Sequence, residues 1–373
     1  MQGAIMKNKT LLITFGTRPE AIKLIPLIRT LKSSDNFELK VCVSAQHRQM
    51  LDSVLDEYEI VPDYDLDVMK ERQSLDYLTS SIVTKTGEIL DTLNPCAVIV
   101  HGDTTTAFCS ALAAFYRHIP VVHIEAGLRT KNIFSPHPEE FNRRAISIIA
   151  DYHFAPTKTA ADTLIAEGTD KNRIFTVGNT AIDTLLYNLK CFTSEDIEDI
   201  RIEIDKKCVL ITVHRREHSE LELREIFEAI RTLCLRHPDV SAIYPLHKTP
   251  RIRELAKKYF DNIPNIALCE PLNTKDFHFL LSKAYMVLTD SGGIQEEAVA
   301  LGIPTLVLRS VTERQEGIGH SLLLAGTNKE DILFSAERLL NDTVEYRRLS
   351  RASNVFGDGH ASERIADILG KLL

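Results

Sequence analysis

Three carboxylic acids in the first half of the chain stand where they could transfer protons. Asp103 follows the apolar run AVIVH, Glu125 ends the next apolar run, and Glu139 stands at the start of the helix expected after SPHP. Carboxylates that crowd together raise one another's pKa, so that an acidic side chain can act as general base or acid near neutral pH. The spacing therefore favours acid-base catalysis. Asp103 could instead be the N-cap of a helix, which is the commoner use of Asp at such a place.

A histidine lies two residues before each of these acids, at His101, His123 and His137. Imidazoles and carboxylates are common ligands of zinc, so a metal site is conceivable. No HxxxH or HExxH pattern accompanies them, and such patterns are what a helical metal site requires. Histidines within apolar strands are more often buried and hydrogen-bonded to their neighbours. We predict no metal site.

The segment 285–309 in the second half reads as a strand, a glycine turn, a helix and a second strand. Ser291, Gly292 and Gly293 let the backbone approach a ligand closely, and we expect the helix to begin at about Ile294. Its free N–H groups would face an anion such as a nucleotide phosphate. Glu296 and Glu297 would then fall in its first turn and could accept hydrogen bonds from ribose hydroxyls. A well-capped helix without a ligand is an equally good interpretation of this pattern.

Cationic side chains follow other predicted strands. Arg18 comes after TLLITF, with Lys23 one turn into the next helix. A guanidinium holds phosphate through paired hydrogen bonds. His214 follows another strand and precedes two arginines, so it could clamp a diphosphate and donate a proton to a departing phosphate. Arg314 could close over the same phosphates. Each of these residues, taken alone, could also be a solvated loop residue.

The elements that position these residues alternate between short apolar strands and amphipathic helices, which is the pattern of parallel α/β sheets. The helix expected after residue 17 has an apolar face of Ala21, Leu24, Ile25, Ile28 and Leu31. In open parallel sheets, ligands bind beyond the carboxyl ends of the strands. Strand density falls between about residues 189 and 207, so we expect two similar halves with a boundary near residues 180–190.

Composition restricts the class of protein. A chain of 373 residues exceeds what one hydrophobic core usually supports, so two domains are expected. The net charge of −8 argues against a nucleic-acid partner, because that affinity comes from Lys and Arg. The seven cysteines lack CxxC spacing and are interpreted as reduced thiols. No run approaches the roughly 18 apolar residues of a membrane span. We expect a soluble, cytoplasmic protein without a membrane partner.

Several motifs in the same order resemble those of the bacterial non-hydrolysing UDP-N-acetylglucosamine 2-epimerases. They are GTRPEAIKLIPLI, GDTTTAF, HIEAGLRT, SPHPEEFNRR, HFAPT, VGNTAIDTLL, ITVHRRE, LTDSGGIQEEA and TERQEG. The resemblance implies a glycosyltransferase-B-like α/β fold of two Rossmann-like domains facing a deep cleft. It implies an N-terminal domain of residues 7–179 with a returning C-terminal helix, 361–373, and a UDP-binding domain of residues 180–360. It also implies a homodimer with neither metal nor cofactor.

The family interconverts UDP-GlcNAc and UDP-ManNAc by anti elimination of UDP, which leaves 2-acetamidoglucal, followed by re-addition. By similarity, the acid-base residues would be Asp103, Glu125, Glu139 and His214. The residues around the phosphates or sugar would be Arg18, Lys23 and Arg314. Ser291, Gly292 and Gly293 would hold the diphosphate, and Glu297 the ribose. The resemblance does not indicate which carboxylate takes the C2 proton.

Two further expectations follow from the resemblance. The turn GTRPEAIK differs from the GSRAEYG-like turn of hydrolysing relatives and favours the reversible enzyme. Members of this group are often activated by substrate bound beside the active site, and the residues resembling that allosteric site are Gln46, Gln49, Arg72 and His247. After HRRE, however, the chain has HSELELREIF where the family has a short Asn- or Gly-containing loop. The pathway implied is surface polysaccharide synthesis.

Two other functions remain open from the sequence. A retaining glycosyltransferase of the same architecture would share the UDP pocket, but it would have less use for three acids in the first half. A non-catalytic sensor of nucleotide sugars would not need intact carboxylates at positions 103, 125 and 139.

Overall fold

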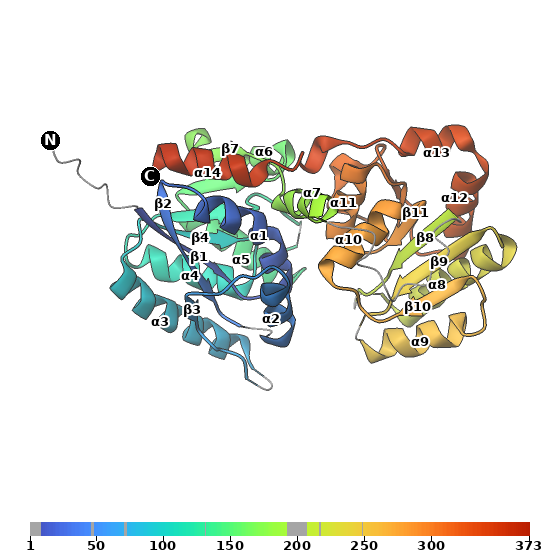
Figure 1. Ribbon diagram of the computed structural model, residues 1–373, viewed down its shortest axis with the longest axis horizontal. Helices are drawn as coiled ribbons and strands as arrows, with labels where there is room; N and C mark the ends of the chain where they lie inside the picture. Colours follow the sequence, from blue (N-terminus) through green and yellow to red (C-terminus); the bar gives the residue numbers. More distant parts are fainter. Residues whose placement is uncertain are drawn as a thin grey trace. The chain divides into compact units, whose positions relative to one another are not determined.

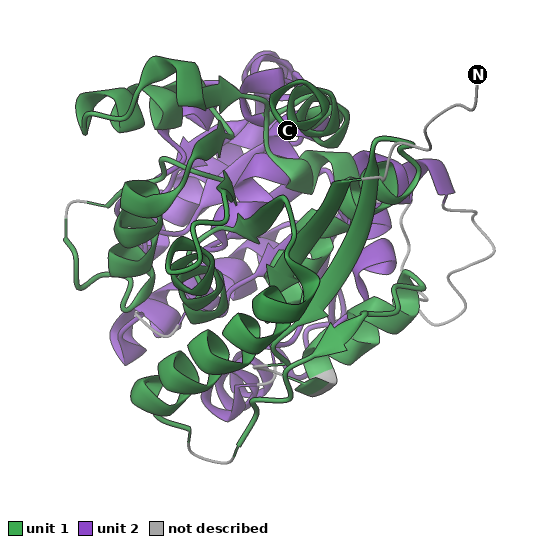
Figure 2. Cartoon of the chain, turned by 90° about the vertical axis from the view of Figure 1, so that its left-hand side faces the viewer, with its two compact units in different colours: residues 1–184, 357–373 green, residues 185–356 purple. Residues whose placement is uncertain are grey.

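The computed structural model describes residues 9–45, 48–70, 73–130, 132–191, 207–215, 218–247 and 249–373. Two of the residues predicted for an allosteric site, Gln46 and Arg72, lie outside these ranges, as does the side chain of Gln49. The chain divides into two compact units (Figure 2). Unit 1 comprises the described residues up to Thr184 together with Gly357–Leu373, and unit 2 comprises those of Leu185–Phe356.

Unit 1 is built on a parallel sheet with the strand order β3-β2-β1-β4-β5-β6-β7. Its strands are β1 (Lys9–Phe15), β2 (Phe37–Val43), β3 (Tyr64–Asp65), β4 (Ala97–His101), β5 (Val121–Ile124), β6 (Tyr152–Ala155) and β7 (Ile174–Thr176). The order reverses between β1 and β4, because β1 pairs with β2 on one side and with β4 on the other. Such a topological switch point is where open α/β sheets bind ligands.

Helices surround this sheet (Figure 1). They are α1 (Arg18–Lys32), α2 (Arg48–Glu57), α3 (Leu75–Leu93), α4 (Thr105–Phe115), α5 (Glu139–Ile149), α6 (Lys158–Ala166), the short η1 (Lys171–Arg173) and α14 (Ala361–Leu372). The helix α7 (Thr180–Cys191) begins in unit 1 and continues after Thr184 into unit 2. The predicted apolar face of α1 is confirmed, since all five of its residues are buried. α3 packs on α4 and α4 on α5, while α1 packs against α2 and α14.

The C-terminal helix α14 is fastened within unit 1 by one buried carboxylate. Asp183, in α7, accepts hydrogen bonds from the backbone N–H groups of Ala361 (3.1 Å) and Ser362 (2.6 Å). These are among the N–H groups that a helix leaves unsatisfied at its start. Asp183 thus acts as a cap from a distant part of the sequence, and the apolar residues Ile365 and Leu369 are buried against the unit.

Unit 2 repeats the architecture with the strand order β10-β9-β8-β11-β12-β13, again all parallel. Its strands are β8 (Lys207–Thr212), β9 (Val240–Pro245), β10 (Ile266–Cys269), β11 (Met286–Thr289), β12 (Thr305–Val307) and β13 (Leu322–Leu324). Its helices are α8 (Glu220–Arg236), α9 (Pro250–Phe260), α10 (Thr274–Lys283), α11 (Gly292–Leu301), α12 (Lys329–Asn341) and α13 (Thr343–Leu349), with short turns η3 (Gln315–Gly317) and η4 (Asn354–Phe356). The switch point lies between β8 and β11. The prediction of an α/β fold with two Rossmann-like parallel sheets is confirmed.

In the described part of the chain, no helix combines the length and the apolar character that crossing a bilayer would demand.

Candidate functional site

In unit 1, neighbouring strands β1, β4 and β5 bring their carboxyl ends to one edge of the sheet. Gly16 follows β1 there in close contact with its surroundings. A Cβ atom at this position would lie 2.1 Å from Ser44 Oγ and 2.3 Å from Thr106 Oγ1, so only glycine fits. Asp103 and Glu125 follow β4 and β5 at the same edge. The topology therefore places these two acids together, as the sequence predicted.

Asp103 is not the N-cap of the helix that follows it. The cap of α4 is Thr104, whose hydroxyl accepts the Ala107 N–H at 3.1 Å. The Asp103 carboxylate is instead paired with the Arg143 guanidinium, and its backbone carbonyl accepts a hydrogen bond from Asn142 Nδ2 at 2.9 Å. The capping alternative is therefore wrong, because the chain turns into α4 one residue later.

Burial raises the pKa of Asp103 above its ordinary value. Arg143 opposes this shift, while the charges of Glu125 and then Glu139 reinforce it. Both neighbouring acids thus act electrostatically on Asp103, which is the crowding expected from their spacing. Glu139 is the first residue of α5 and is half-buried.

Glu125 lies in a backbone conformation that side chains avoid, with φ of 63°. For a residue other than glycine this costs roughly 1–2 kcal/mol, and strained positions of this kind cluster at functional sites. Its carboxylate is paired with the Lys23 ammonium and accepts a hydrogen bond from Asn179 Nδ2 at 3.2 Å. His101 Nε2 lies 3.9 Å away. Burial lowers the pKa of His101 to about 4, so its ring is neutral at physiological pH.

Two functional candidates in unit 1 were missed from the sequence. Arg143 connects Asp103 to the buried Glu140, whose Oε2 is 3.4 Å from Arg143 Nη1. The sequence did hold an indication of this role, because Arg143 stands four residues after Glu139 and therefore on the same face of the helix. Glu20 is buried and accepts hydrogen bonds from the Gly16 and Thr17 backbone N–H groups and from both the Thr17 and Thr104 hydroxyls. The capping-box pattern of Thr17 and Glu20 could have predicted these contacts of Glu20 with Thr17.

The cations predicted in the first half differ in their surroundings. Lys23 is engaged with Glu125, in a pair that is largely shielded from solvent. Arg18 is the first residue of α1 and is half-buried at the carboxyl end of β1. Lys23 therefore belongs to the acidic cluster, whereas Arg18 stands at a helix N-terminus, where anions are favoured.

The histidines of this sheet are buried. His123 Nε2 lies 2.8 Å from the Gly102 carbonyl oxygen, and burial lowers the pKa of His123 to about 3. His153, opposite it on β6, also has its pKa lowered by burial, to about 4. Among the residues that the structure describes, His, Cys, Asp and Glu side chains form no group of three that could hold a metal ion.

In unit 2, the glycine segment after β11 belongs to the helix itself. Ser291 is the N-cap of α11, which begins at Gly292 rather than at the predicted Ile294. Glu296 and Glu297 therefore fall in the second turn, and their predicted place in the first turn is wrong. The prediction failed because both glycines are helical. The Ser291 side chain makes no capping hydrogen bond.

The two glycines have different environments. A Cβ atom at Gly292 would lie 2.8 Å from the Cζ atom of Arg314, so the guanidinium covers this residue. A Cβ atom at Gly293 would meet nothing within 4 Å. No packing within the described chain demands glycine at position 293. The opening leaves room for a ligand at the N-terminus of α11, where N–H groups face an anion.

The acids of α11 have separate partners. Glu296 Oε1 accepts a hydrogen bond from Arg314 Nε at 2.9 Å, so this buried carboxylate positions the guanidinium. Glu297 Oε1 lies 3.5 Å from His278 Nε2. Glu313 extends the network, since it accepts paired hydrogen bonds from Arg309 at 2.9 and 3.1 Å. Burial opposes ionisation of Glu313, but the two arginines outweigh it and hold the pKa at about 2.

His214 follows β8 beside another residue that the sequence analysis missed. The fully buried Asp290, after β11, accepts the His214 backbone N–H at 2.8 Å, and its Oδ1 is 3.3 Å from His214 Nδ1. The rings of His214 and His247 stack with centroids 5.4 Å apart. The structure thus brings His247, predicted for a separate allosteric site, against His214.

Comparisons with known proteins agree along nearly the whole chain. The profile of a family described as UDP-N-acetylglucosamine 2-epimerase matches residues 29–370. UDP-N-acetylglucosamine 2-epimerase of Bacillus subtilis (strain 168) is 48% identical over 98% of this chain and 96% of its own. The structure of UDP-GlcNAc 2-epimerase from Neisseria meningitidis bound to UDP-GlcNAc is 41% identical, with a TM-score of 0.91 over 97% of this chain and 100% of that one. The S. aureus MnaA-UDP co-structure is 45% identical, with a TM-score of 0.89 over 98% and 96% of the respective chains.

Proposed function

Because the chain belongs to the UDP-N-acetylglucosamine 2-epimerase family, we propose that it is an isomerase that interconverts UDP-GlcNAc and UDP-ManNAc at C2 of the sugar. The observation that supports this proposal is that Asp103 and Glu125 follow neighbouring strands, with Glu139 close enough to act electrostatically on Asp103, in a fold shared with a UDP-GlcNAc-bound relative. A nucleotide-binding protein without this chemistry would have no need to bury and crowd these carboxylates. No cofactor is proposed, since the reaction is a proton transfer coupled to loss of a diphosphate.

The chemistry is an elimination followed by an addition. A carboxylate of the unit 1 cluster removes the C2 proton, and the electron pair of the C–H bond forms the C1–C2 double bond. The bond from C1 to the diphosphate oxygen breaks, which gives UDP and 2-acetamidoglucal. UDP then adds back to C1 while C2 receives a proton on the opposite face. A general base is most effective when its pKa lies near the working pH, and the raised pKa of Asp103 supports this role.

Within unit 2, the N-terminus of α11 would bind the diphosphate. Ser291, Gly292 and Gly293 supply N–H groups and an open approach, and Arg314 supplies a positive charge beside Gly292. These groups favour the charge that develops on the leaving UDP. Glu297 would accept hydrogen bonds from the ribose hydroxyls. Arg18 of unit 1, at the N-terminus of α1, is a further candidate ligand of the phosphates or sugar.

His214 would serve the leaving group as proton donor. Asp290 faces its Nδ1 atom, and a carboxylate in this position holds an imidazole in one tautomer and stabilises its protonated form. The Nε2 atom is then the one presented to a ligand. Its stacking on His247 supports a coupling between the proposed proton donor and His247, one of the residues proposed for activator binding.

The protein would act as a cytoplasmic homodimer that supplies surface polysaccharide synthesis without hydrolysing its substrate. Exposed apolar side chains at the end of α4 and along α5 support self-association. They are Phe115, Tyr116, Phe141 and Ile148, which are 50, 62, 49 and 83% exposed. Because α4 packs against α5, these side chains lie on adjacent helices, and we propose that they form the dimer contact.

The function is tested by incubating the purified protein with UDP-GlcNAc in deuterated water, without added metal, and following the sugar by proton NMR. UDP-ManNAc with deuterium at C2 is the expected product. Free ManNAc with UDP would show a hydrolase instead. An unchanged sugar spectrum would overturn the proposal and favour a glycosyltransferase or a sensor.

A further inference from the structure

One buried carboxylate in unit 2 serves two histidines. Asp290 is fully buried at the end of β11. Its Oδ1 atom lies 3.3 Å from His214 Nδ1, and its Oδ2 atom lies 3.3 Å from His218 Nε2. Oδ2 also accepts the backbone N–H groups of His214 (2.8 Å) and Arg215 (2.9 Å). The two imidazoles therefore share a single negative charge.

His218 has no role in the function proposed above, yet it is held in the interior. Its side chain is only 7% exposed, and within the described chain Nε2 has no hydrogen-bond partner of good geometry. An imidazole nitrogen buried without a partner is costly, so its nearness to Asp290 is its main compensation. His218 also lies in the HSELELREIF segment, where this chain departs from the loop of the family that it resembles.

We propose that His218 is a positioning residue that controls the proton affinity of His214 through their shared partner, Asp290. The inference rests on the proposed function, in which His214 donates a proton to the departing UDP. His218 itself would touch neither substrate nor reacting atoms.

The sign of the effect follows from electrostatics. A negative charge beside an imidazole favours its protonated form, whereas a second positive charge nearby disfavours it. When His218 carries a proton, it neutralises part of the Asp290 charge and repels a proton on His214. The effect depends on the charge of His218, because its Nε2 lies 3.3 Å from Asp290 Oδ2. Removal of the His218 imidazole should therefore raise the pH at which His214 loses its proton.

Asp290 remains ionised in these surroundings. Burial works to raise its pKa, but His218, His214 and the backbone N–H groups of 214 and 215 outweigh burial and lower it. A change of charge on either imidazole therefore acts on the other through this ionised carboxylate.

Other charged or titratable groups around this pair lie on α8, on α9, and on or just after β9. The pKa of Glu222 in α8 is lowered, mainly by hydrogen bonds from Ser219 and to a smaller extent by the charge of His218. Arg251 of α9 donates to the His218 backbone carbonyl at 3.3 Å. Tyr244 of β9 donates to the Val213 carbonyl at 2.6 Å, and its pKa is raised by burial and then by Asp290. His247 stacks on His214 from after β9. Among these groups, only His218 approaches the second oxygen of Asp290 with a titratable ring.

The test uses the intact protein with 13C-labelled histidine rings and follows each Cε1–H signal by NMR against pH. The His214 signal is assigned by its loss in H214Q. In H218Q, whose amide reaches a similar distance but cannot be protonated, we expect the His214 titration midpoint to rise by about 0.5–1 pH unit. The alkaline limb of the kcat/KM profile should move upward with it. The matched control is H237Q, because His237 pairs with Glu337 at 3.8 Å in the same unit.

A change of less than about 0.2 units in His214, equal to that of the control, would overturn the inference. If H218Q does not fold, the smaller H218N replaces it. The wild-type protein supplies an independent test. If the two imidazoles are coupled, the plot of the His214 chemical shift against pH should change slope at the titration midpoint of His218. A single-step plot would count against the inference. These titrations need no substrate. Failure of the coupling with epimerisation intact would therefore remove this inference alone, whereas absent epimerisation with coupling present would remove the proposed function alone.

Discussion

Lys23 and Glu125 form an ion pair that joins helix α1 to the carboxyl end of β5, across 102 residues of sequence. The pair is largely shielded, with side-chain exposures of 18 and 10%. It holds an acid whose backbone is strained at φ of 63°. Lys23 thus does more than attract a phosphate, because its ammonium fixes the charge and the place of a proposed acid-base residue.

Substitution of Lys23 by Gln should impair the reaction more than it impairs folding. Loss of the ammonium leaves a shielded Glu125 without its cation and lets the strained carboxylate move. We expect turnover to fall roughly 100-fold or more, as for loss of a positioned acid-base group. The measurement is initial rate by coupled detection of UDP-ManNAc.

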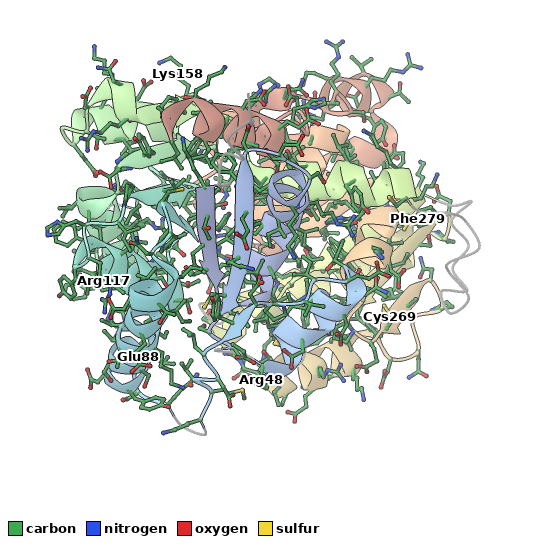
Figure 3. All side chains as sticks on the ribbon, turned by 60° about the vertical axis from the view of Figure 1, so that its left-hand side comes forward. Arg48, Glu88, Arg117, Lys158, Cys269 and Phe279 are labelled. Atoms are coloured by element: carbon green, nitrogen blue, oxygen red, sulfur yellow. The ribbon has the colours of Figure 1, made fainter. Side chains whose placement is uncertain are left out.

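The matched control is K158Q. Lys158 projects from α6 at the surface (Figure 3) and pairs with Asp162 at 2.6 Å with 84% exposure. Exposed pairs of this kind contribute little to stability, so K158Q should behave as wild type. Equal rates in K23Q and K158Q would refute a catalytic role for the Lys23–Glu125 pair.

Substitution of Asp103 by Asn should separate chemistry from binding. Asn cannot accept the C2 proton, yet its oxygen can still face Arg143, which now pairs with Asp103. Turnover should fall by about 10² to 10⁴, while UDP affinity by calorimetry stays within about twofold, since Asp103 is not among the proposed ligands of the diphosphate. Persistent turnover in D103N would mean that the acid-base assignment is wrong.

The sequence predicted the strand ends better than the local geometry of the turns. Parallel βαβ order alone placed Asp103 and Glu125 at one edge, because carboxyl ends of neighbouring parallel strands must meet. The start of α11 was misplaced because Gly292 and Gly293 suggest a loop by their type, although in this chain they are helical. Local patterns cannot say which conformation a glycine adopts.

Residues recruited from distant parts of the chain were beyond sequence reasoning. Asp290 directly follows a strand, a place where an Asp would be expected to cap the next helix. Its carboxylate lies beside His214 and His218 only because β8 and β11 are adjacent in the sheet. The short strands β3 and β13 were also missed. At two and three residues they carry no periodic signal.

Substitution of Gly293 by Ala should weaken UDP binding without harm to the fold. Its Cβ would meet no protein atom within 4 Å, and Ala is the better helix former by up to about 1 kcal/mol. If the diphosphate occupies this opening, the added methyl group should cost at least about tenfold in affinity, equivalent to 1.4 kcal/mol. Calorimetry with UDP and thermal unfolding are the measurements.

Two further variants serve as a control and a comparison for the Gly293 substitution. G370A, in helix α14, adds a methyl group 3.4 Å from Asn36 Nδ2 and should leave UDP affinity unchanged. G292A should displace the Arg314 guanidinium, whose Cζ atom would lie 2.8 Å away, and so weaken binding by a different route. Unaltered UDP affinity in G293A would place the phosphates elsewhere.

The buried Glu20 should make folding stability depend on pH. Burial raises the pKa of Glu20 to about 7, although hydrogen bonds from Thr104, Thr17 and Gly16 oppose the shift. Its ordinary value is 4.5, so between these two pH values the folded state holds a proton that the unfolded state has lost. The contribution of Glu20 to stability is thus complete below pH 4.5 and is lost as the pH rises to about 7.

The Glu20→Gln variant isolates this effect. Gln keeps one carbonyl oxygen for the Gly16 and Thr17 N–H groups and does not titrate. The free energy of unfolding of wild type should therefore fall relative to that of E20Q by about 3 kcal/mol as the pH rises toward about 8. Acids with a lowered pKa, such as Glu313 at about 2, make the folded state more stable as the pH rises. Their contribution is the same in both proteins and cancels when the two free energies of unfolding are subtracted. Urea unfolding across this range measures it. A difference constant within about 0.5 kcal/mol would show that Glu20 stays ionised, held by its four hydrogen-bond donors at the edge where β1 and β4 meet.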